Sequence, residues 1–163
     1  ETTQLCIRQL QKYMQAGDEI ADIGTGSGIL GITALKLGAG HVYGTDLDEE
    51  AVPAVHDNLQ ANGLPESCFD MVVGNVIGDE DIKTRMGLGK YDIVVANILA
   101  PVIVLLTGEV GPLLKKDGLF ITSGILDQRE AKVLEAFRQH EDIWEVLEVN
   151  HQGEWVNVTA RRK

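Results

Sequence analysis

The sequence predicts an α/β fold with a seven-stranded, mainly parallel sheet, helices on both faces and an antiparallel hairpin at the C-terminal end. Short apolar runs rich in valine, which are typical of buried parallel strands, recur along the chain. Segments with helical spacing and helix-stop residues lie between them. The last two runs flank the turn His151-Gln152-Gly153, which is typical of a hairpin. Because alternating strands and helices cover both faces of a parallel sheet, we expect a Rossmann-like domain.

The first half of the chain alternates helices and strands. Apolar residues at helical spacing over 5–14 predict the first helix, which ends before Gly17. Asp48 is expected to cap the third helix, and Pro53 is unfavourable inside it, so its start shifts toward Val52. We predict strands over 19–23, 41–45 and 69–73, and helices over 5–14, 29–37 and 48–62.

The second half continues this alternation and then changes character. Pro101 suits the first turn of a helix that runs to Leu114, ahead of a turn at 116–118. We predict helices over 81–86, 101–114 and 127–139, strands over 91–96 and 119–122, and a hairpin of 143–149 with 154–160.

Composition limits the partners of this chain. Its 163 residues, 44% of them hydrophobic, suit one compact domain, which we place over 1–163. The net charge of -11 argues against nucleic-acid binding, because phosphate contacts need clustered Lys and Arg, and the basic cluster is confined to 161–163. A basic protein partner is compatible with this charge.

Cysteine usage and the N-terminal sequence indicate the cellular setting. Cys6 and Cys68 lie far apart without metal-ligand spacing, so we expect reduced cysteines and no metal site. We see no long apolar span and no signal-like leader, which predicts a cytoplasmic protein without membrane contact. The chain begins at Glu1 without methionine, so we expect a fragment of a longer protein. No motif indicates an oligomeric state.

The main binding motif is a glycine-rich run, D-I-G-T-G-S-G, that follows the first strand and opens a helix. Its backbone can therefore wrap a small charged ligand. Asp46 closes the next strand about twenty residues on, where doubly wound folds place a ribose. We predict a nucleoside cofactor that contacts Asp22, Gly24, Thr25, Gly26, Gly28, Asp46 and Leu47.

The identity of the cofactor depends on where the glycine motif begins relative to the end of the first strand. The glycines Gly26, Gly28 and Gly31 match the dinucleotide fingerprint G-x-G-x-x-G, but the match begins after the strand has ended. The carboxylate of Asp22 at the strand end would repel a pyrophosphate and suit the ammonium group of a methionine moiety. We therefore predict S-adenosylmethionine, with an NAD-dependent oxidoreductase as the alternative.

Two asparagines extend this site, because Asn75 and Asn97 also follow strands whose carboxyl ends meet at one edge of the sheet. We expect Asn97 to be the catalytic residue. Methyl transfer to an amine is an in-line displacement, so an amide oxygen can hold the N–H bonds of a neutral nitrogen and aim its lone pair. Capping of the next helix by Asn97, and turn roles for Asn75 and Asp46, remain open alternatives. Trp155 is expected to serve packing.

Several motifs together resemble the class I S-adenosylmethionine methyltransferases, and within them the family that modifies the eleventh protein of the large ribosomal subunit. The resemblance covers essentially the whole chain. Thr2-Thr3 resembles the end of the family motif G-T-G-x-H-x-T-T. The most specific motifs are Asn97-Ile98-Leu99-Ala100, Ser123-Gly124-Ile125-Leu126 and Gly153-Glu154-Trp155, in this order.

This resemblance implies methylation of lysine side-chain and N-terminal amines on a large-subunit ribosomal protein. It also implies a separate N-terminal recognition domain that this chain lacks, which leaves open a cofactor-binding module that is inactive by itself. The run Asn97-Ile98-Leu99-Ala100 lacks the prolines of the N-P-P-Y pattern, so amine specificity rests on the family likeness. The cofactor positions that the resemblance implies are Thr2, Thr3, Asp22, Gly24, Gly26, Asp46, Asn75 and Asn97.

Overall fold

The computed structural model describes residues 1–163 and contains one seven-stranded sheet with the order β3-β2-β1-β4-β5-β7-β6. The first five strands in this order run parallel, whereas β7 is antiparallel to both of its neighbours. The predicted mainly parallel sheet with a C-terminal hairpin is thus confirmed. The strands are β1 (Glu19–Ile23), β2 (His41–Asp46), β3 (Phe69–Val73), β4 (Tyr91–Asn97), β5 (Leu114–Leu126), β6 (Trp144–Gln152) and β7 (Trp155–Arg162).

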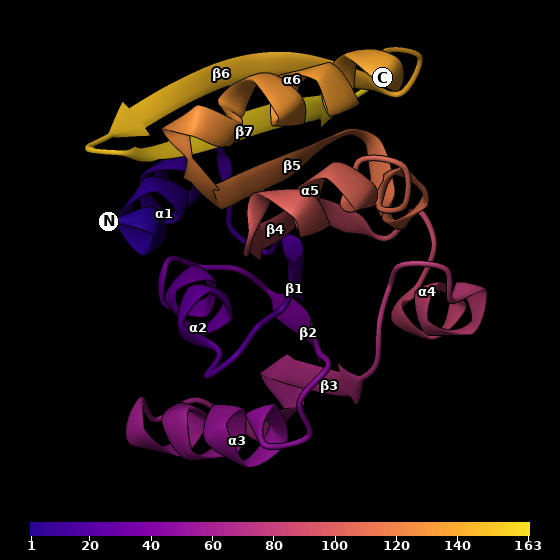
Figure 1. The fold of residues 1–163 in the computed structure, drawn as a ribbon. Coiled ribbons are helices and arrows are strands. Elements are labelled where there is room, and N and C mark those ends of the chain that lie inside the picture. The colour runs from indigo at the N-terminus through magenta and orange to yellow at the C-terminus, as the bar shows by residue number, and fades with distance from the viewer.

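Six α-helices surround this sheet (Figure 1). Short 3₁₀ segments precede β3, β5 and the last helix. None of the helices is long and apolar enough to span a bilayer. The helices are α1 (Thr2–Tyr13), α2 (Ile29–Lys36), α3 (Ala51–Ala61), α4 (Glu80–Met86), α5 (Ala100–Leu106) and α6 (Glu130–Gln139).

Two hydrophobic cores lie on opposite faces of the sheet. Alternate residues of β4 show this division, because Ile93 and Val95 pack with α1, α2 and α3, whereas Val94 and Ala96 pack with α4, α5 and α6. A strand that is buried on both faces has no polar side, and this explains the continuous valine-rich runs in the sequence.

An aromatic cluster attaches α6 to the sheet. The ring centroids of Phe120, Phe137 and Trp144 lie 5.5 to 5.9 Å apart. The indole Nε1–H of Trp144 donates to the carbonyl of Thr107 at 2.8 Å, so the same cluster also fixes the chain just after α5.

The predicted helix over 101–114 is wrong at its C-terminal end, because α5 ends at Leu106. The Thr107 hydroxyl donates to the Val104 carbonyl at 2.7 Å, and Gly108 follows. Pro112 then lies in a 3₁₀ turn, where its missing N–H is tolerated. Gly108 and Pro112 are the sequence signals that place this helix end correctly.

Strand β5 is much longer than the predicted strand over 119–122. Leu114 pairs with Tyr91 and Leu119 pairs with Ile93, so residues 115–118 form an excursion between two paired segments. The predicted turn lies within this excursion. Beyond Thr122, the pairing with β7 shifts register before it resumes at Ile125.

Asp48 does not cap α3, which corrects another prediction. Glu50 is the N-cap residue of α3, and Asp48 instead accepts a hydrogen bond from the Glu50 N–H at 2.9 Å. Because α3 begins at Ala51, Pro53 lies in the first turn, where a proline nitrogen is tolerated.

Candidate cofactor site

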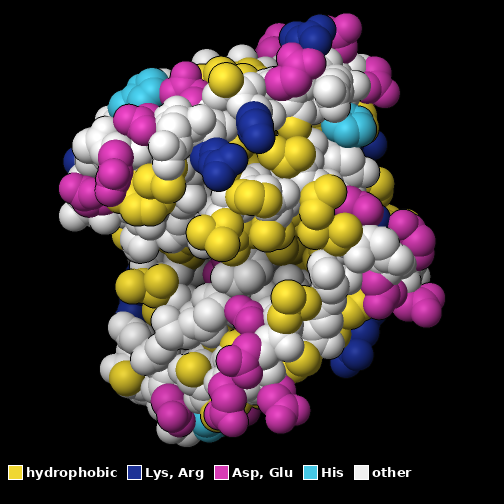
Figure 2. Space-filling view, viewed as in Figure 1, with side chains coloured by type: hydrophobic (Ala, Val, Ile, Leu, Met, Phe, Trp, Pro, Cys, Tyr) yellow, Lys and Arg dark blue, Asp and Glu magenta, His cyan; other side chains and the backbone are white.

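A cavity of about 600 Å³ opens at the carboxyl edge of the parallel strands, and this volume is in the range of small-molecule sites. Figure 2 shows a hollow near the middle of this face, with hydrophobic side chains gathered above it, over α5, and acidic side chains below it. The segments that follow β1, β2, β3 and β4 all contribute to the wall. The predicted convergence of strand ends is therefore observed.

The wall contains six of the predicted site residues: Thr2, Gly24, Asp46, Leu47, Asn75 and Asn97. The other five predicted residues do not line the cavity. They are Thr3, Asp22, Thr25, Gly26 and Gly28. Gly26 and Thr3 form hydrogen bonds with the wall residues Asp46 and Asn97. The direct role of these five residues in ligand binding stays a prediction.

The turn after β1 approaches the segment after β4 closely. Gly24 has a φ of +71°, and a Cβ atom placed on it would lie 2.8 Å from Cγ2 of Ile98. The Thr25 N–H donates to the Thr45 carbonyl at 2.9 Å, which fixes the turn to β2. A glycine at position 24 thus lets Ile98 pack against the turn at the edge of the cavity.

Asp22 lies beneath this turn. Its side chain is buried and accepts a hydrogen bond from the Thr25 hydroxyl at 2.7 Å. Burial is the main cause that raises the pKa of the Asp22 carboxyl to about 7, although the hydrogen bonds from Thr25 and from the Gly31 N–H oppose this shift. Asp22 supports the glycine turn from inside and is not part of the cavity wall.

Asp46 connects two neighbouring turns. One carboxylate oxygen accepts from the Gly26 N–H at 2.8 Å, and the other accepts from the Asp48 N–H at 3.0 Å. Each carboxylate oxygen can accept more than one hydrogen bond, so acceptor capacity remains on the cavity side. Asp46 therefore stabilises the turns, as the turn alternative predicted, and it also lies in the cavity wall.

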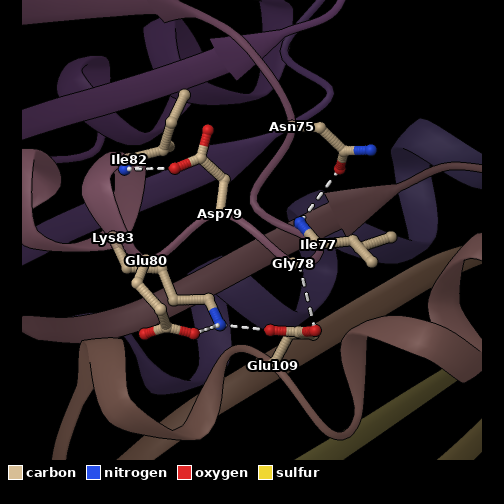
Figure 3. A network of polar contacts seen from close by, with 8 residues as sticks. All are labelled: Asn75, Ile77, Gly78, Asp79, Glu80, Ile82, Lys83 and Glu109. Atoms are coloured by element: carbon tan, nitrogen blue, oxygen red, sulfur yellow. Dashed lines mark hydrogen bonds and ion pairs between the residues drawn. The ribbon is translucent and has the colours of Figure 1, made fainter.

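The Asn75 side chain closes a local turn. Its side-chain oxygen accepts from the Ile77 N–H at 3.0 Å, as Figure 3 shows. The side-chain nitrogen has no partner in the fold, so this wall residue has a free hydrogen-bond donor.

Asn97 ends β4 and belongs to the wall. Its side-chain nitrogen donates to the Thr3 hydroxyl at 3.4 Å, so α1 helps to orient the amide. The N-cap residue of α5 is Leu99, and α5 has no side-chain cap. Asn97 therefore does not cap the helix that follows it.

We did not predict from the sequence which apolar side chains line the cavity. Ile98, Leu99, Val102 and Leu106 contribute to it, and Leu99 is 70% exposed. Their near-helical spacing was the available signal, but the same spacing is typical of an ordinary core-facing helix. Trp155, which we expected to serve packing, also lines the cavity.

The site contains no cluster suited to a metal ion, since no three His, Cys, Asp or Glu side chains come together as a metal-binding group in this structure. Its polar groups are instead carboxylate, amide and hydroxyl groups at the ends of strands. They suit the hydroxyl groups of a ribose and the amino and carboxylate groups of an amino acid.

The solved structure of a TehB-like SAM-dependent methyltransferase from Corynebacterium glutamicum has the same fold. It superposes with a TM-score of 0.74 over 97% of this chain and 87% of that chain, at 19% sequence identity. The cavity lies at the switch point between β1 and β4, where open doubly wound sheets bind their ligands. The fold is thus that of the SAM-dependent methyltransferases.

Closer relatives define the family. The family model described as ribosomal protein L11 methyltransferase (PrmA) matches residues 1–163. A ribosomal protein L11 methyltransferase from Lachnospira eligens is 48% identical over 163 residues, which are 100% of this chain and 51% of the relative. The crystal structure of a ribosomal protein L11 methylase from Lactobacillus delbrueckii subsp. bulgaricus has a TM-score of 0.86 and 33% identity, covering 99% of this chain and 78% of that chain. This chain belongs to the ribosomal protein L11 methyltransferase family.

The family assignment confirms the predicted resemblance and favours S-adenosylmethionine over NAD as the cofactor. Gly31, the last glycine of the apparent dinucleotide fingerprint, lies inside α2 against Phe69 and Val42. The chain spans about half the length of the curated relatives it matches, 51% and 50% for two of them.

Proposed function

We propose that this chain is the cofactor-binding and catalytic part of an S-adenosylmethionine-dependent N-methyltransferase. Its substrates are lysine side-chain and N-terminal amines of a large-subunit ribosomal protein. The relatives named ribosomal protein L11 methyltransferase support this substrate. The cytoplasm is the corresponding location. Residues 1–163, which the family model matches, form the methyltransferase domain, and the family resemblance implies a separate N-terminal recognition domain.

One observation carries the proposal. The Asn97 amide lies in the wall of the cavity, is oriented by Thr3, and is not used to cap a helix. Its side-chain oxygen accepts no hydrogen bond within the fold, so it is free to accept one from an incoming amine. An unused acceptor next to a cofactor-sized cavity is the arrangement that methyl transfer to nitrogen needs.

When bound, S-adenosylmethionine supplies an electrophilic methyl group on a sulfonium. The carboxylate of Asp46 would accept hydrogen bonds from the ribose hydroxyls, and the side-chain nitrogen of Asn75 would donate one to the nucleoside. The Asn97 oxygen would hold an N–H of the amine, so that the nitrogen lone pair faces the methyl carbon. The apolar side chains of Ile98 and Leu99 in the wall would replace water around a bound amine, and this desolvation would favour its neutral form.

A calorimetric titration with S-adenosylhomocysteine tests the site. We expect the chain to bind this ligand and not NADH, and we expect Asp46→Ala to weaken binding at least about tenfold, since it removes a charged acceptor. Asp48→Ala is the matched control, because Asp48 lies outside the wall. Binding of NADH in place of S-adenosylhomocysteine would contradict the proposal.

Methyl transfer is tested with the ribosomal protein substrate and a protein that carries this chain at the full length of the family, by mass spectrometry of the product. Asn97→Ala should keep the cofactor affinity and lose most of the turnover. Unchanged turnover would exclude the catalytic role of Asn97. Incubation of residues 1–163 with the same substrate distinguishes an active domain from a binding module that needs further sequence.

A further inference from the structure

A buried ion pair joins α4 to the segment that follows α5. Lys83 has a side-chain exposure of 3%, and its ammonium contacts Glu109 and, at 3.1 Å, the Oε1 atom of Glu80 (Figure 3). Burial lowers the pKa of Lys83, but the hydrogen bonds and charges of Glu109 and Glu80 more than offset this effect, so the net shift is upward. Glu80 is 81% exposed, so Glu109 is the principal partner.

Glu109 also forms a hydrogen bond with the loop between β3 and α4. Its second carboxylate oxygen, Oε1, accepts a hydrogen bond from the Gly78 N–H at 3.2 Å. Glu109 thereby connects the ammonium of Lys83 to the backbone of the segment between β3 and α4. In Figure 3 the Glu109 side chain lies between Lys83 and Gly78.

The same loop forms one part of the cavity wall, through residues 74–77. The Gly74 N–H also donates to the Asp46 carbonyl at 2.9 Å, and Val76 is buried in the core. The remaining hydrogen bonds are local: Asn75 bonds to the Ile77 N–H, and Asp79 caps α4 by accepting from the Ile82 N–H at 3.2 Å. Figure 1 shows α4 at one side of the molecule, apart from the other helices. Glu109 supplies the side-chain link from the segment after α5 to this loop and to α4, while the N–H groups of Gly89 and Lys90 join the chain after α4 to the carbonyls of Pro112 and Leu113.

We propose that Lys83 and Glu109 form a positioning pair that holds wall residues 74–77 in the conformation that binds the cofactor. The identity of the ligand rests on the proposed function, whereas the effect on the loop does not. Neither residue lines the cavity, so both act through the loop. If the loop leaves its bound-state conformation, the apparent Kd rises in inverse proportion to the fraction of competent molecules.

The experiment compares Lys83→Met, Glu109→Gln and Glu109→Ala by calorimetric titration with S-adenosylhomocysteine, at a temperature where circular dichroism shows each variant folded. We expect Lys83→Met to raise the Kd about tenfold, because the unpaired Glu109 carboxylate turns toward water and releases the loop. Glu109→Gln should have a smaller effect than Glu109→Ala, because the glutamine oxygen can still accept from Gly78.

Lys115→Met is the matched control. Lys115 pairs with Asp92 at 3.0 Å, at the opposite end of the strands from the cavity, so its loss should leave the Kd unchanged. Wild-type Kd values in folded Lys83→Met and Glu109→Ala would overturn the proposal. If those two variants do not fold, a wild-type Kd in Glu109→Gln overturns it and a raised Kd supports it.

Hydrogen exchange separates this inference from the proposed function. If the wild-type chain binds no S-adenosylhomocysteine, the proposed cofactor is wrong, yet the amide of Gly78 still reports on the loop. Protection of this amide in the wild type that is lost in Glu109→Ala supports the positioning pair, because the acceptor of its N–H is removed. Equal exchange in the wild type and this variant excludes the pair as the restraint on this loop.

Discussion

The buried carboxyl group of Asp22 makes stability depend on pH. Its pKa is raised from 3.8 to about 7, so the folded chain keeps a proton that the unfolded chain has released between these values. The contribution of Asp22 to stability is therefore fully present below pH 3.8 and is lost as the pH rises through about 7. This loss has a slope of at most about 1.4 kcal/mol per pH unit.

Asp22→Asn should remove this component. Asparagine keeps an oxygen that accepts from Thr25 but has no proton to lose, so the variant should lose less stability than the wild type between pH 5 and pH 7.5. Urea unfolding at both pH values measures the difference. A variant and a wild type with the same pH dependence would show that Asp22 does not titrate in this range.

Gly124 allows a second close approach beside the cavity. It has a φ of +84°, and a Cβ atom on it would lie 2.5 Å from the Ile98 carbonyl oxygen and 3.1 Å from the Asn97 side-chain oxygen. It also sits where the pairing of β5 with β7 shifts register. The bare backbone at this position lets β5 lie against the chain at Asn97.

Gly17 provides a control for substitution of Gly124. Its φ of +85° is nearly the same, but a Cβ atom on it would have no neighbour within 4 Å. Both alanine variants should lose about 1 kcal/mol to backbone strain, whereas Gly124→Ala should lose about 1 to 3 kcal/mol more through the clash. Urea unfolding measures both losses, and equal losses would contradict the close approach.

At the scale of elements, Phe137 is the largest of the three side chains that α6 buries, the others being Val133 and Ala136. Phe137 packs against Phe120 and Trp144, and no residue of α6 lines the cavity. Phe137→Ala should reduce the free energy of unfolding by about 3 to 5 kcal/mol, and Phe137→Leu should cost less because it fills more of the space. Both variants should keep the Kd for S-adenosylhomocysteine while they remain folded. Denaturant titration and calorimetry check the two expectations.

The strands were predictable because burial on both faces leaves an unbroken apolar run, as in Tyr91–Asn97. Polar residues at the ends of such runs could also be assigned to one edge, which explains why Asp46 and Asn97 were expected where the cavity wall lies. The end of α5 was missed because apolar spacing continues past Gly108, although the backbone does not remain helical.

Two features could not be predicted from local sequence. Lys83 and Glu109 lie 26 positions apart, and a lysine and a glutamate on short polar segments are usually solvated. Only the tertiary placement of α4 beside the segment after α5 buries the lysine. The close approach of Gly124 to Ile98 likewise depends on how β4 and β5 are paired, which no single segment encodes.

At the scale of the whole molecule, ligand binding should stabilise the fold. A ligand at 100 times its Kd contributes about 2.7 kcal/mol, which corresponds to a rise in Tm of about 5 to 10 °C for a chain of this size. We expect this rise with S-adenosylhomocysteine and none with NADH, measured by thermal unfolding. Asp46→Ala should lose most of it. A rise of the same size in this variant would place the binding site elsewhere.

The cavity wall combines Thr2 from the first helix with Trp155 from the last strand. Strand β7 is inserted between β5 and β6, so the C-terminal residues complete the sheet as well as the wall. During synthesis, a growing chain would therefore lack part of the wall until β7 has emerged and paired. The cofactor can then bind only at the end of folding. A chain truncated before Trp155 would fold without a complete cavity.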